Sequence, residues 1–364
     1  MRLDPPLPLD VVVETSLGCN LRCPMCDQHQ TGLTAQRRTI APALLDQLSR
    51  EVLPTAARMA LSVSGEPLMT GELHTLVSAA QRAGVRLVIA SNGTVLPAAD
   101  GDLDRLVGQC ARIAISLDSL DAPTYAQIRG ADRLSVVLAN LRRLASARGR
   151  VPRRARPRLG LTVVWMRQNI DELPVLIGLA ASLDLDFVSV AHLTVFGGEQ
   201  DGDSLRHVPE LADLRRREAI ESSHQHGVFV DMPPPYGATE PSPRPPVALA
   251  WSSGHPLRRL RHHVGVWRWR RASGGAGGCP YLESTAYVSI DGTVAPCCMP
   301  GRPTLGDLNE RSFAQIWSGQ RARDLRQRLR DGRPTGACAH CSVHRNGAYV
   351  PGDERTVRPS HGVP

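Results

Sequence analysis

Short apolar runs alternate with longer stretches of helical spacing over the first two thirds of the chain. Six runs rich in Val, Ile, Leu and Ala predict strands at 11–14, 59–63, 86–90, 112–117, 159–165 and 187–191. Between them, apolar residues recur at helical spacing and predict helices at 43–53, 71–83, 99–108, 133–148 and 171–183. Strands that alternate with helices predict an α/β fold with a parallel sheet.

The last third of the chain is organised differently. Residues 232–278 are rich in Pro and Gly, which interrupt regular structure, and they read as a connecting segment. Beyond it, alternation on both sides of Asp291-Gly292 predicts a β-hairpin, and residues 313–329 predict an amphipathic helix. We therefore expect four regions, at 1–231, 232–278, 279–349 and 350–364.

Composition narrows the classes of protein that the chain can belong to. All 43 basic residues are Arg, so the 364 residues contain no lysine for a Schiff base or a phosphate-binding loop. The net charge is +8. No apolar run is long enough to cross a bilayer, and the N-terminus lacks the features of a signal peptide. The sequence predicts a cytoplasmic protein that does not associate with membranes.

Most of the nine cysteines fall in two groups near the ends of the chain, a pattern more typical of metal binding than of disulfides. The first group, Cys19, Cys23 and Cys26, follows the first predicted strand with the spacing C-x3-C-x2-C. Three thiolates on one loop can hold three irons of a 4Fe–4S cube and leave the fourth iron open to a ligand. A zinc ion with His29 as an additional ligand is the alternative.

The second group lies beyond the connecting segment. The predicted hairpin brings two of its cysteines together, and the predicted helix returns the chain to a C-x2-C pair. Four converging thiolates form a closed site that suits either zinc or a fully ligated 4Fe–4S cluster. The four candidate ligands are Cys279, Cys297, Cys338 and Cys341.

Two cysteines are left over. Cys110 precedes a predicted strand and reads as a small buried apolar residue. Cys298 directly follows the candidate ligand Cys297, and neighbouring residues rarely both reach one cluster. We therefore interpret Cys298 as a free thiol that faces the mouth of the barrel, although the two neighbours could exchange roles.

The C-x3-C-x2-C loop behind the first strand resembles that of the radical SAM superfamily. The resemblance implies a partial (β/α)6 barrel of the TIM type, which the six predicted strands match. It also implies that the first three cysteines hold a 4Fe–4S cluster whose open iron binds S-adenosylmethionine (SAM). One electron from an external donor of the flavodoxin or ferredoxin type then yields a 5′-deoxyadenosyl radical. That radical takes a hydrogen atom from an unactivated C–H bond.

Three motifs at the ends of predicted strands resemble the same superfamily, although each alone is also a common turn. Residues 64–67, S-G-E-P, are similar to its G-G-E-P motif with serine in the first position, and they imply a contact with the SAM ammonium. Residues 91–93, S-N-G, imply a contact with the ribose or the methionyl part. Residues 116–119 with 129–130 are similar to its S-L-D and R-G stretch, in which Ser and Arg contact the SAM carboxylate. The implied cofactor-binding residues are Gly65, Glu66, Asn92, Ser116, Asp118 and Arg129.

The C-terminal region resembles the SPASM/twitch extension of radical SAM enzymes, including the L-G-D-L segment at 305–308. Only four ligand cysteines are present, which favours the shorter twitch form with one auxiliary 4Fe–4S cluster. In spacing, the region is similar to twitch-type enzymes that modify carbohydrates and aminocyclitols.

The spare thiol favours an epimerase. The deoxyadenosyl radical would remove hydrogen from one face of a carbon, and Cys298 would return hydrogen to the other face. The resemblance supports this, because related radical SAM epimerases use a cysteine in this way. The first alternative is a dehydrogenase that oxidises an alcohol through the auxiliary cluster, with Glu14, His192 or Glu199 as candidate bases.

Cys19 comes too early in the chain for an N-terminal peptide-recognition domain, so we expect a small natural-product substrate such as a sugar, aminocyclitol or nucleoside of antibiotic biosynthesis. A ribosomal peptide is the alternative substrate. A non-catalytic electron carrier would leave the strand-end motifs without a role. An Arg- and Trp-rich stretch at 258–271 could bind RNA, but we favour a surface segment whose Trp side chains pack inward.

Overall fold

A computed structural model describes residues 6–195, 198–236, 263–268, 281–299 and 301–341, together with Leu260 and Cys279. The regions at 237–259 and 342–364, which include most of the predicted connecting segment and the whole predicted tail, lie outside the described residues. The domain boundaries expected from the sequence therefore stay predictions.

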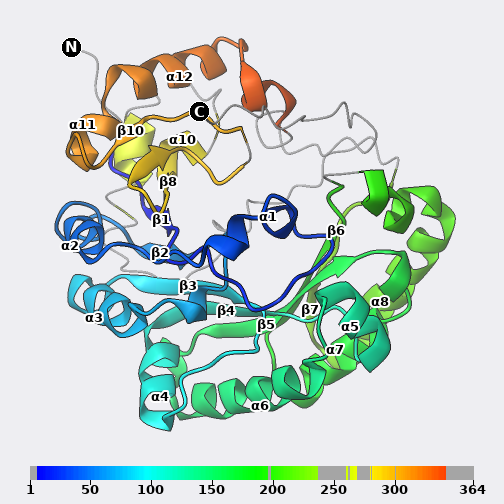
Figure 1. Cartoon of the computed structure of the whole chain (residues 1–364). Coiled ribbons are helices and arrows are strands. Elements are labelled where there is room, and N and C mark those ends of the chain that lie inside the picture. The colour runs from blue at the N-terminus through cyan, green and yellow to red at the C-terminus, as the bar shows by residue number, and fades with distance from the viewer. Residues whose placement is uncertain are drawn as a thin grey trace.

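The described residues form one ten-stranded sheet (Figure 1). Its strand order is β10-β9-β8-β1-β2-β3-β4-β5-β6-β7, and all neighbours from β8 to β7 are parallel. The strands are β1 Asp10–Val13, β2 Arg58–Leu61, β3 Arg86–Ser91, β4 Cys110–Ser116, β5 Arg158–Trp165, β6 Phe187–His192, β7 Phe229–Asp231, β8 Thr285–Val288, β9 Thr293–Ala295 and β10 Gly306–Asp307. All six predicted strands are present, which confirms the α/β barrel-like fold.

Helices cover the convex side of this curved sheet (Figure 1). The helices of the barrel region are α1 Asp27–Gln30, α2 Pro42–Glu51, α3 Leu73–Ala83, α4 Asp100–Gln109, α5 Ala122–Arg129, α6 Leu134–Arg150, α7 Leu173–Ser182 and α8 Pro209–His226. The C-terminal region adds α10 Tyr281–Ser284, α11 Phe313–Trp317 and α12 Gln320–Arg330. Each predicted helix of the barrel region overlaps one of these.

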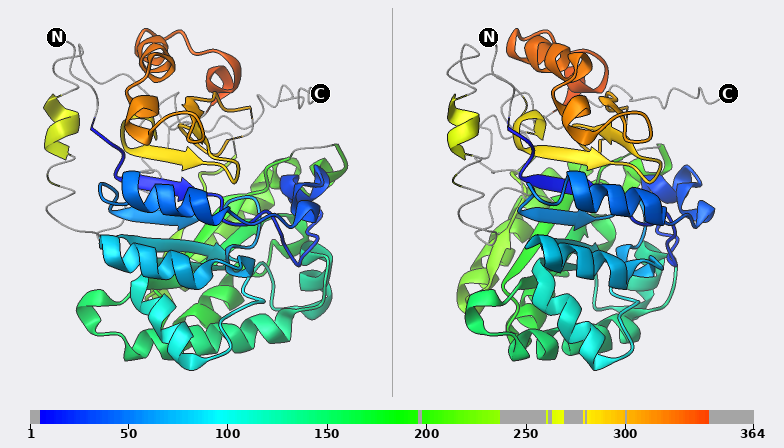
Figure 2. Two further views of the ribbon diagram at one scale, coloured as in Figure 1. Left: turned by 60° about the vertical axis from the view of Figure 1, so that its left-hand side comes forward. Right: turned by 90° about the vertical axis from the view of Figure 1, so that its left-hand side faces the viewer.

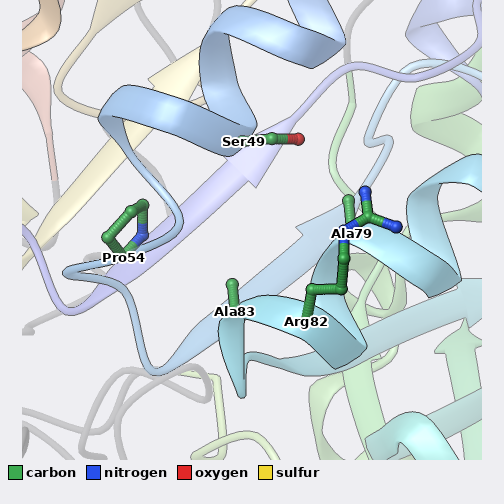
Figure 3. Close-up of a pocket in the computed structure, with 5 residues that line it drawn as sticks. All are labelled: Ser49, Pro54, Ala79, Arg82 and Ala83. Atoms are coloured by element: carbon green, nitrogen blue, oxygen red, sulfur yellow. The ribbon is translucent and has the colours of Figure 1, made fainter.

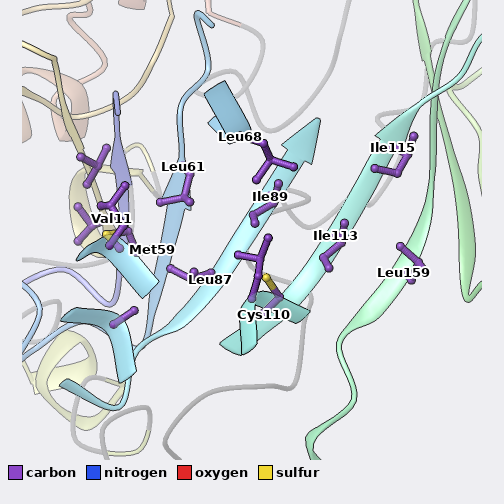
Figure 4. Packing of buried hydrophobic residues seen from close by; sticks show 14 of the residues in the cluster. Val11, Met59, Leu61, Leu68, Leu87, Ile89, Cys110, Ile113, Ile115 and Leu159 are labelled. Atoms are coloured by element: carbon purple, nitrogen blue, oxygen red, sulfur yellow. The ribbon is translucent and has the colours of Figure 1, made fainter. Parts of the chain in front are cut away.

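The core lies between the sheet and the helices. Aliphatic side chains on alternate strand positions, such as Met59, Leu87 and Ile113, are almost fully buried on the helix side (Figure 4). Cys110 is also fully buried there, and burial raises the pKa of its thiol to about 12, which confirms it as a small core residue. On the opposite, inner face, Ala90 and Ala191 near the carboxyl ends of β3 and β6 are exposed, whereas the larger Phe187 and Tyr287 on the same face are buried. The inner face therefore leaves room at the carboxyl ends of the strands.

The structure corrects three expectations about local elements. A seventh barrel strand, β7, and the long helix α8 lie in a region where the sequence predicted no element, because β7 has three residues and α8 is polar on most of its faces. The helix predicted at 313–329 is two helices, broken at Ser318 and Gly319. A Cβ atom at Gly319 would lie 2.8 Å from the Gln315 carbonyl oxygen, which explains why the chain turns at a glycine. Trp267, expected to pack inward, is 58% exposed, and Trp269 lies outside the described residues.

The predicted hairpin exists, and its place in the molecule is unexpected. Strands β8 and β9 are antiparallel around Asp291 and Gly292. Strand β8 also pairs in parallel with β1, with Val12 opposite Tyr287, so that the C-terminal region extends the barrel sheet (Figure 2). The ion pair between Arg38 and Asp291 adds a side-chain link between the two regions. The hairpin is therefore part of the same sheet as the barrel.

Candidate active site

The first cysteine group lies on the loop between β1 and α1. Cys23 is buried, whereas Cys19 and Cys26 are partly exposed. The backbone N–H of Cys26 donates to the Cys23 carbonyl at 3.0 Å, which turns the loop back on itself. Burial raises the pKa of the Cys23 thiol to about 11, while the nearby Arg129 charge opposes that rise. The loop thus presents three thiols at the carboxyl end of the first strand, as the sequence predicted.

Two glycines let other strand-end segments contact this loop directly. A Cβ atom at Gly65 would lie 2.3 Å from the Ser16 carbonyl oxygen and 2.8 Å from that of Gly18. Gly130 has a φ of +69°, and a Cβ there would lie 2.4 Å from the Arg22 carbonyl oxygen. Both glycines belong to motifs assigned to SAM binding. In the structure they also fix the position of the cysteine loop from two sides.

Glu66 and Asn92 connect the ends of β2 and β3 to Cys19. The Glu66 side chain is 2% exposed, and its carboxylate accepts from Ser91 Oγ and from the Asn92 N–H, both at 2.7 Å. Burial raises the pKa of Glu66, and these hydrogen bonds oppose the rise. The Asn92 amide nitrogen lies 3.7 Å from Cys19 Sγ. The Glu66 carboxylate therefore already accepts hydrogen bonds from the protein. Its contact with the SAM ammonium stays a prediction.

Asp118 and Arg129 form a buried ion pair beside Cys23. Arg129 Nη2 lies 2.6 Å from Asp118 Oδ2, and Asp118 is fully buried. Burial raises the pKa of Asp118, whereas Arg129 and a hydrogen bond from the Val164 N–H lower it. Cys23 Sγ lies 3.5 Å from the Arg129 carbonyl oxygen. The pair therefore connects the end of β4 to the cysteine loop.

Ser116 lies at the end of β4, half-buried, with its hydroxyl 3.3 Å from Thr162 Oγ1 on β5. This places it on the accessible inner side of the strand ends. The predicted contacts of Ser116 and Arg129 with the SAM carboxylate stay predictions.

Sequence analysis missed Ser62 and assigned no structural role to Glu14. Ser62, at a φ of +49°, accepts at 3.0 Å from the backbone N–H groups of both Thr15 and Ser16. The buried Glu14 carboxylate accepts from the N–H groups of Val63 and Ser64. These bonds hold the end of β1 against the end of β2. The sequence did contain a signal for both residues, because each is a polar residue directly after an apolar strand.

The C-terminal cysteines come together from three segments. The charges of Cys341 and Cys297 both act on Cys279, and those of Cys341 and Cys338 both act on Cys297. Burial raises the pKa of Cys279 to about 12 and that of Cys297 to about 11. The four predicted auxiliary ligands are therefore neighbours.

Cys298 has different surroundings. Burial raises the pKa of its thiol, and the charges that act on it are those of Arg302 and Glu14. Glu14 follows the first barrel strand, but the Cys298 charge also acts on Cys297 and, with the charges of Cys279, Cys297 and Cys341, on Tyr281. The assignment of Cys297 as a ligand and of Cys298 as a free thiol therefore stays a prediction.

The donor sets fit iron–sulfur clusters better than zinc. Among the residues that the structure describes, no three His, Cys, Asp or Glu side chains are arranged to hold a single metal ion. One tetrahedral zinc ion with Zn–S bonds of about 2.3 Å would need its sulfurs about 4 Å apart. A 4Fe–4S cube binds each thiolate at a separate iron and accepts wider spacing. Both groups consist of thiols, the ligands that such clusters use.

An apolar cluster lies beside the cysteine loop. Ile128, Met166 and Leu193 are buried together, and Met25, between Cys23 and Cys26, packs against them. Gln200 donates to the Pro24 carbonyl oxygen at 2.7 Å, which ties the segment after β6 to the same loop. The loop is thus packed on an apolar surface from the ends of three barrel elements.

A shallow pocket lies elsewhere, between α2 and α3. Its lining residues are Ser49, Pro54, Ala79, Arg82 and Ala83 (Figure 3). None of them belongs to the cysteine groups or to the strand-end motifs, so we assign this pocket no part in the chemistry.

Comparison with known families matches both regions. Residues 13–180 match the Radical SAM superfamily, and residues 279–342 match the SPASM iron-sulfur cluster-binding domain. The chain therefore carries the two domains of a radical SAM enzyme with a SPASM domain. Such an enzyme uses a SAM-binding 4Fe–4S cluster, auxiliary iron–sulfur chemistry and SAM, as the sequence predicted.

No helix among the described residues is long and apolar enough to span a membrane.

Characterised relatives of this radical SAM enzyme are distant. Pre-heme d1 synthase of Dinoroseobacter shibae is 27% identical over 92% of this chain and 80% of its own length. PqqA peptide cyclase of Xanthomonas euvesicatoria pv. vesicatoria is 26% identical over 88% of this chain and 77% of its own length. GTP 3′,8-cyclase of Marinobacter nauticus is 28% identical over 57% of this chain and 62% of its own length.

Solved structures show the same fold. SuiB of Streptococcus suis, bound to S-adenosylmethionine, has a TM-score of 0.60 at 15% identity, covering 94% of this chain and 73% of its own. The enzyme anSMEcpe with bound AdoMet has a TM-score of 0.59 at 15% identity, covering 88% and 84%. These likenesses do not single out the carbohydrate-modifying twitch enzymes that the cysteine spacing suggested.

Proposed function

We propose that this radical SAM enzyme takes a hydrogen atom from a carbon of a peptide, rather than from a small natural product. The support comes from its relatives, two of which are named or solved as peptide-binding proteins: PqqA peptide cyclase, and SuiB bound to its precursor peptide SuiA. The sequence alone favoured a sugar, aminocyclitol or nucleoside. The peptide, which was the alternative, fits the relatives at least as well.

In this proposal, Cys19, Cys23 and Cys26 hold the SAM-binding cluster, and Cys279, Cys297, Cys338 and Cys341 hold the auxiliary cluster. The loaded site supplies a 5′-deoxyadenosyl radical. The chain contributes the fixed cysteine loop, held by Gly65, Gly130 and the buried Asp118–Arg129 pair. It also contributes the accessible inner face of the strands, where Ala90 and Ala191 leave space for a substrate carbon.

Epimerisation is the reaction that we favour on this substrate, because Cys298 is left over from the four predicted ligands and the charge of Glu14, at the end of β1, acts on it. Abstraction of hydrogen leaves a carbon radical, and the Cys298 S–H bond gives hydrogen to its other face. An electron from the external donor and a proton from solvent then restore the thiol. The second candidate is oxidation, in which the radical loses a proton and its electron passes to the auxiliary site. The buried Glu14, whose charge acts on Cys298, would then be the candidate base.

The test uses anaerobically reconstituted protein, dithionite and SAM in deuterium oxide. Short peptides encoded beside the gene form one arm, and sugars, aminocyclitols and nucleosides form the other. We expect a peptide to increase 5′-deoxyadenosine release and to change mass. Gain of one deuteron indicates epimerisation, and loss of two hydrogens indicates oxidation. A response to small molecules with none to peptides would contradict the proposal.

A further inference from the structure

We propose that Arg302 binds a carboxylate group of the substrate beside Cys298; this inference rests on the proposed function. Arg302 follows the Cys297–Cys298 pair in a tight turn, in which its N–H donates to the Met299 carbonyl oxygen at 3.2 Å. The turn places a half-buried guanidinium beside the Cys298 backbone. Sequence analysis gave this residue no role.

The guanidinium is held in one orientation. Its central carbon lies 4.1 Å from the centre of the Tyr287 ring, in a cation–π contact. Its Nη1 donates to the Cys298 carbonyl oxygen at 3.2 Å and to that of Met299 at 3.4 Å. A group fixed by stacking and by bonds on one edge loses little further entropy when it binds a ligand.

The stacking partner lies on the inner side of the barrel sheet. Tyr287 is opposite Val12 on β1, and Val12 is opposite Ala60 on β2. Residues opposite one another across strands share a face, so Tyr287 lies on the inner face, where it is 3% exposed. Its surroundings include Glu14 and Ser64, directly beside the motif that is expected to bind SAM. Arg302 therefore stacks on a residue of the strand that joins the C-terminal region to β1.

One edge of the guanidinium remains for a ligand. Within the described part of the chain, Arg302 Nε and Nη2 have no hydrogen bond or carboxylate partner. By contrast, Arg58 and Arg129 are each paired with a buried aspartate. Two adjacent N–H groups in a fixed fork match the two oxygens of a carboxylate. A peptide supplies this group as an Asp or Glu side chain or as its C-terminus, which favours carboxylate over phosphate.

The test measures the accessibility of Arg302 in the wild-type holoenzyme, which avoids variants that fail to fold. Phenylglyoxal labels arginines, and mass spectrometry of digested protein gives the labelling rate of each. The probes are N-acetylglutamate N-methylamide for a side-chain carboxylate, N-acetylalanine for a C-terminal one, and N-acetylglutamine N-methylamide as the uncharged match. Arg321, an exposed residue on α12, is the internal control.

We expect one of the acidic probes to slow labelling of Arg302 but not of Arg321. A probe at about twice its Kd leaves about a third of the sites open, which slows labelling about threefold. The glutamine probe should have no effect. Equal slowing by the glutamine probe, no slowing by either acid, equal slowing at Arg321, or full protection by SAM alone would each overturn the inference. Failure of the proposed function is seen separately, when peptides do not increase 5′-deoxyadenosine release from the same preparation.

Discussion

Replacing Gly130 by alanine tests whether the glycines of the strand-end motifs position the cysteine loop. Gly130 ends helix α5 with a φ of +69°, and Gly227 ends helix α8 with a φ of +67°. A Cβ at Gly227 would have no neighbour within 4 Å, whereas one at Gly130 would lie 2.4 Å from the Arg22 carbonyl oxygen. The two substitutions therefore share the backbone strain and differ in the clash with the loop.

The expected magnitudes follow from this difference. A left-handed alanine costs about 1–2 kcal/mol, and the lower entropy of the unfolded chain offsets about 0.4–1 kcal/mol of that. Gly227→Ala should therefore lower the free energy of unfolding by about 1 kcal/mol. For Gly130→Ala, ordinary contact begins near 3.4 Å, so the Arg22 carbonyl must move by about 1 Å. Such overpacking adds about 1–3 kcal/mol, and a displacement of about 1 Å at a reacting site can cost about 100-fold in rate.

The assay compares both variants with wild type after anaerobic reconstitution. Iron content, urea unfolding of the metal-free chain and the rate of 5′-deoxyadenosine formation are measured in parallel. We expect Gly227→Ala to keep its iron and its rate, and Gly130→Ala to lose most of its rate. Equal iron content and equal rates in the two variants would refute the idea that Gly130 positions the loop.

The remaining predictions concern the clusters, the ion pair and the free thiol. Cys23→Ala should abolish 5′-deoxyadenosine formation, whereas Cys110→Ala should alter only stability, as measured by the same assay and by urea unfolding. Metal analysis of the reconstituted chain should find about eight irons if both clusters are 4Fe–4S; about four irons with one zinc would contradict the auxiliary assignment. Arg129→Met leaves the Asp118 carboxylate buried without its cation and should cost about 3–5 kcal/mol, part of which Asp118→Asn in a double variant should restore. Cys298→Ser should lower the yield of deuterated product per 5′-deoxyadenosine; an unchanged yield would remove the epimerase argument.

The sequence predicts the fold and the cysteine groups well because these depend on local patterns. Apolar strands are short and clear, and carboxyl ends of parallel strands meet at one edge, which brings the motifs at 64–67, 91–93 and 116–119 to the cysteine loop. The spacing of motifs along the sequence cannot give the distance between the strand-end glycines and the cysteine loop. The contacts of Gly65 and Gly130 with the loop backbone follow from how the strand ends pack, and no local pattern records them.

Long-range pairing was also beyond the sequence. The hairpin at Asp291-Gly292 is a local signal and was predicted, but its pairing with β1 joins segments at opposite ends of the chain. The substrate class stays open between a small molecule and a peptide for a related reason. Cysteine spacing describes how metal is held, whereas the choice of substrate depends on the inner face of the barrel, where Tyr287 and Arg302 meet only after folding.

The pairing of β8 with β1 sets the order in which the chain can mature during synthesis. Asp10 leaves the ribosome early, but its partner Thr285 follows 275 residues later. At about 5–20 residues per second, one edge of the first strand stays uncovered for about 15–55 seconds. The nascent barrel therefore carries an open strand edge until its last quarter emerges. A chain stopped before residue 285 would keep that edge, and insertion of clusters is best timed after release.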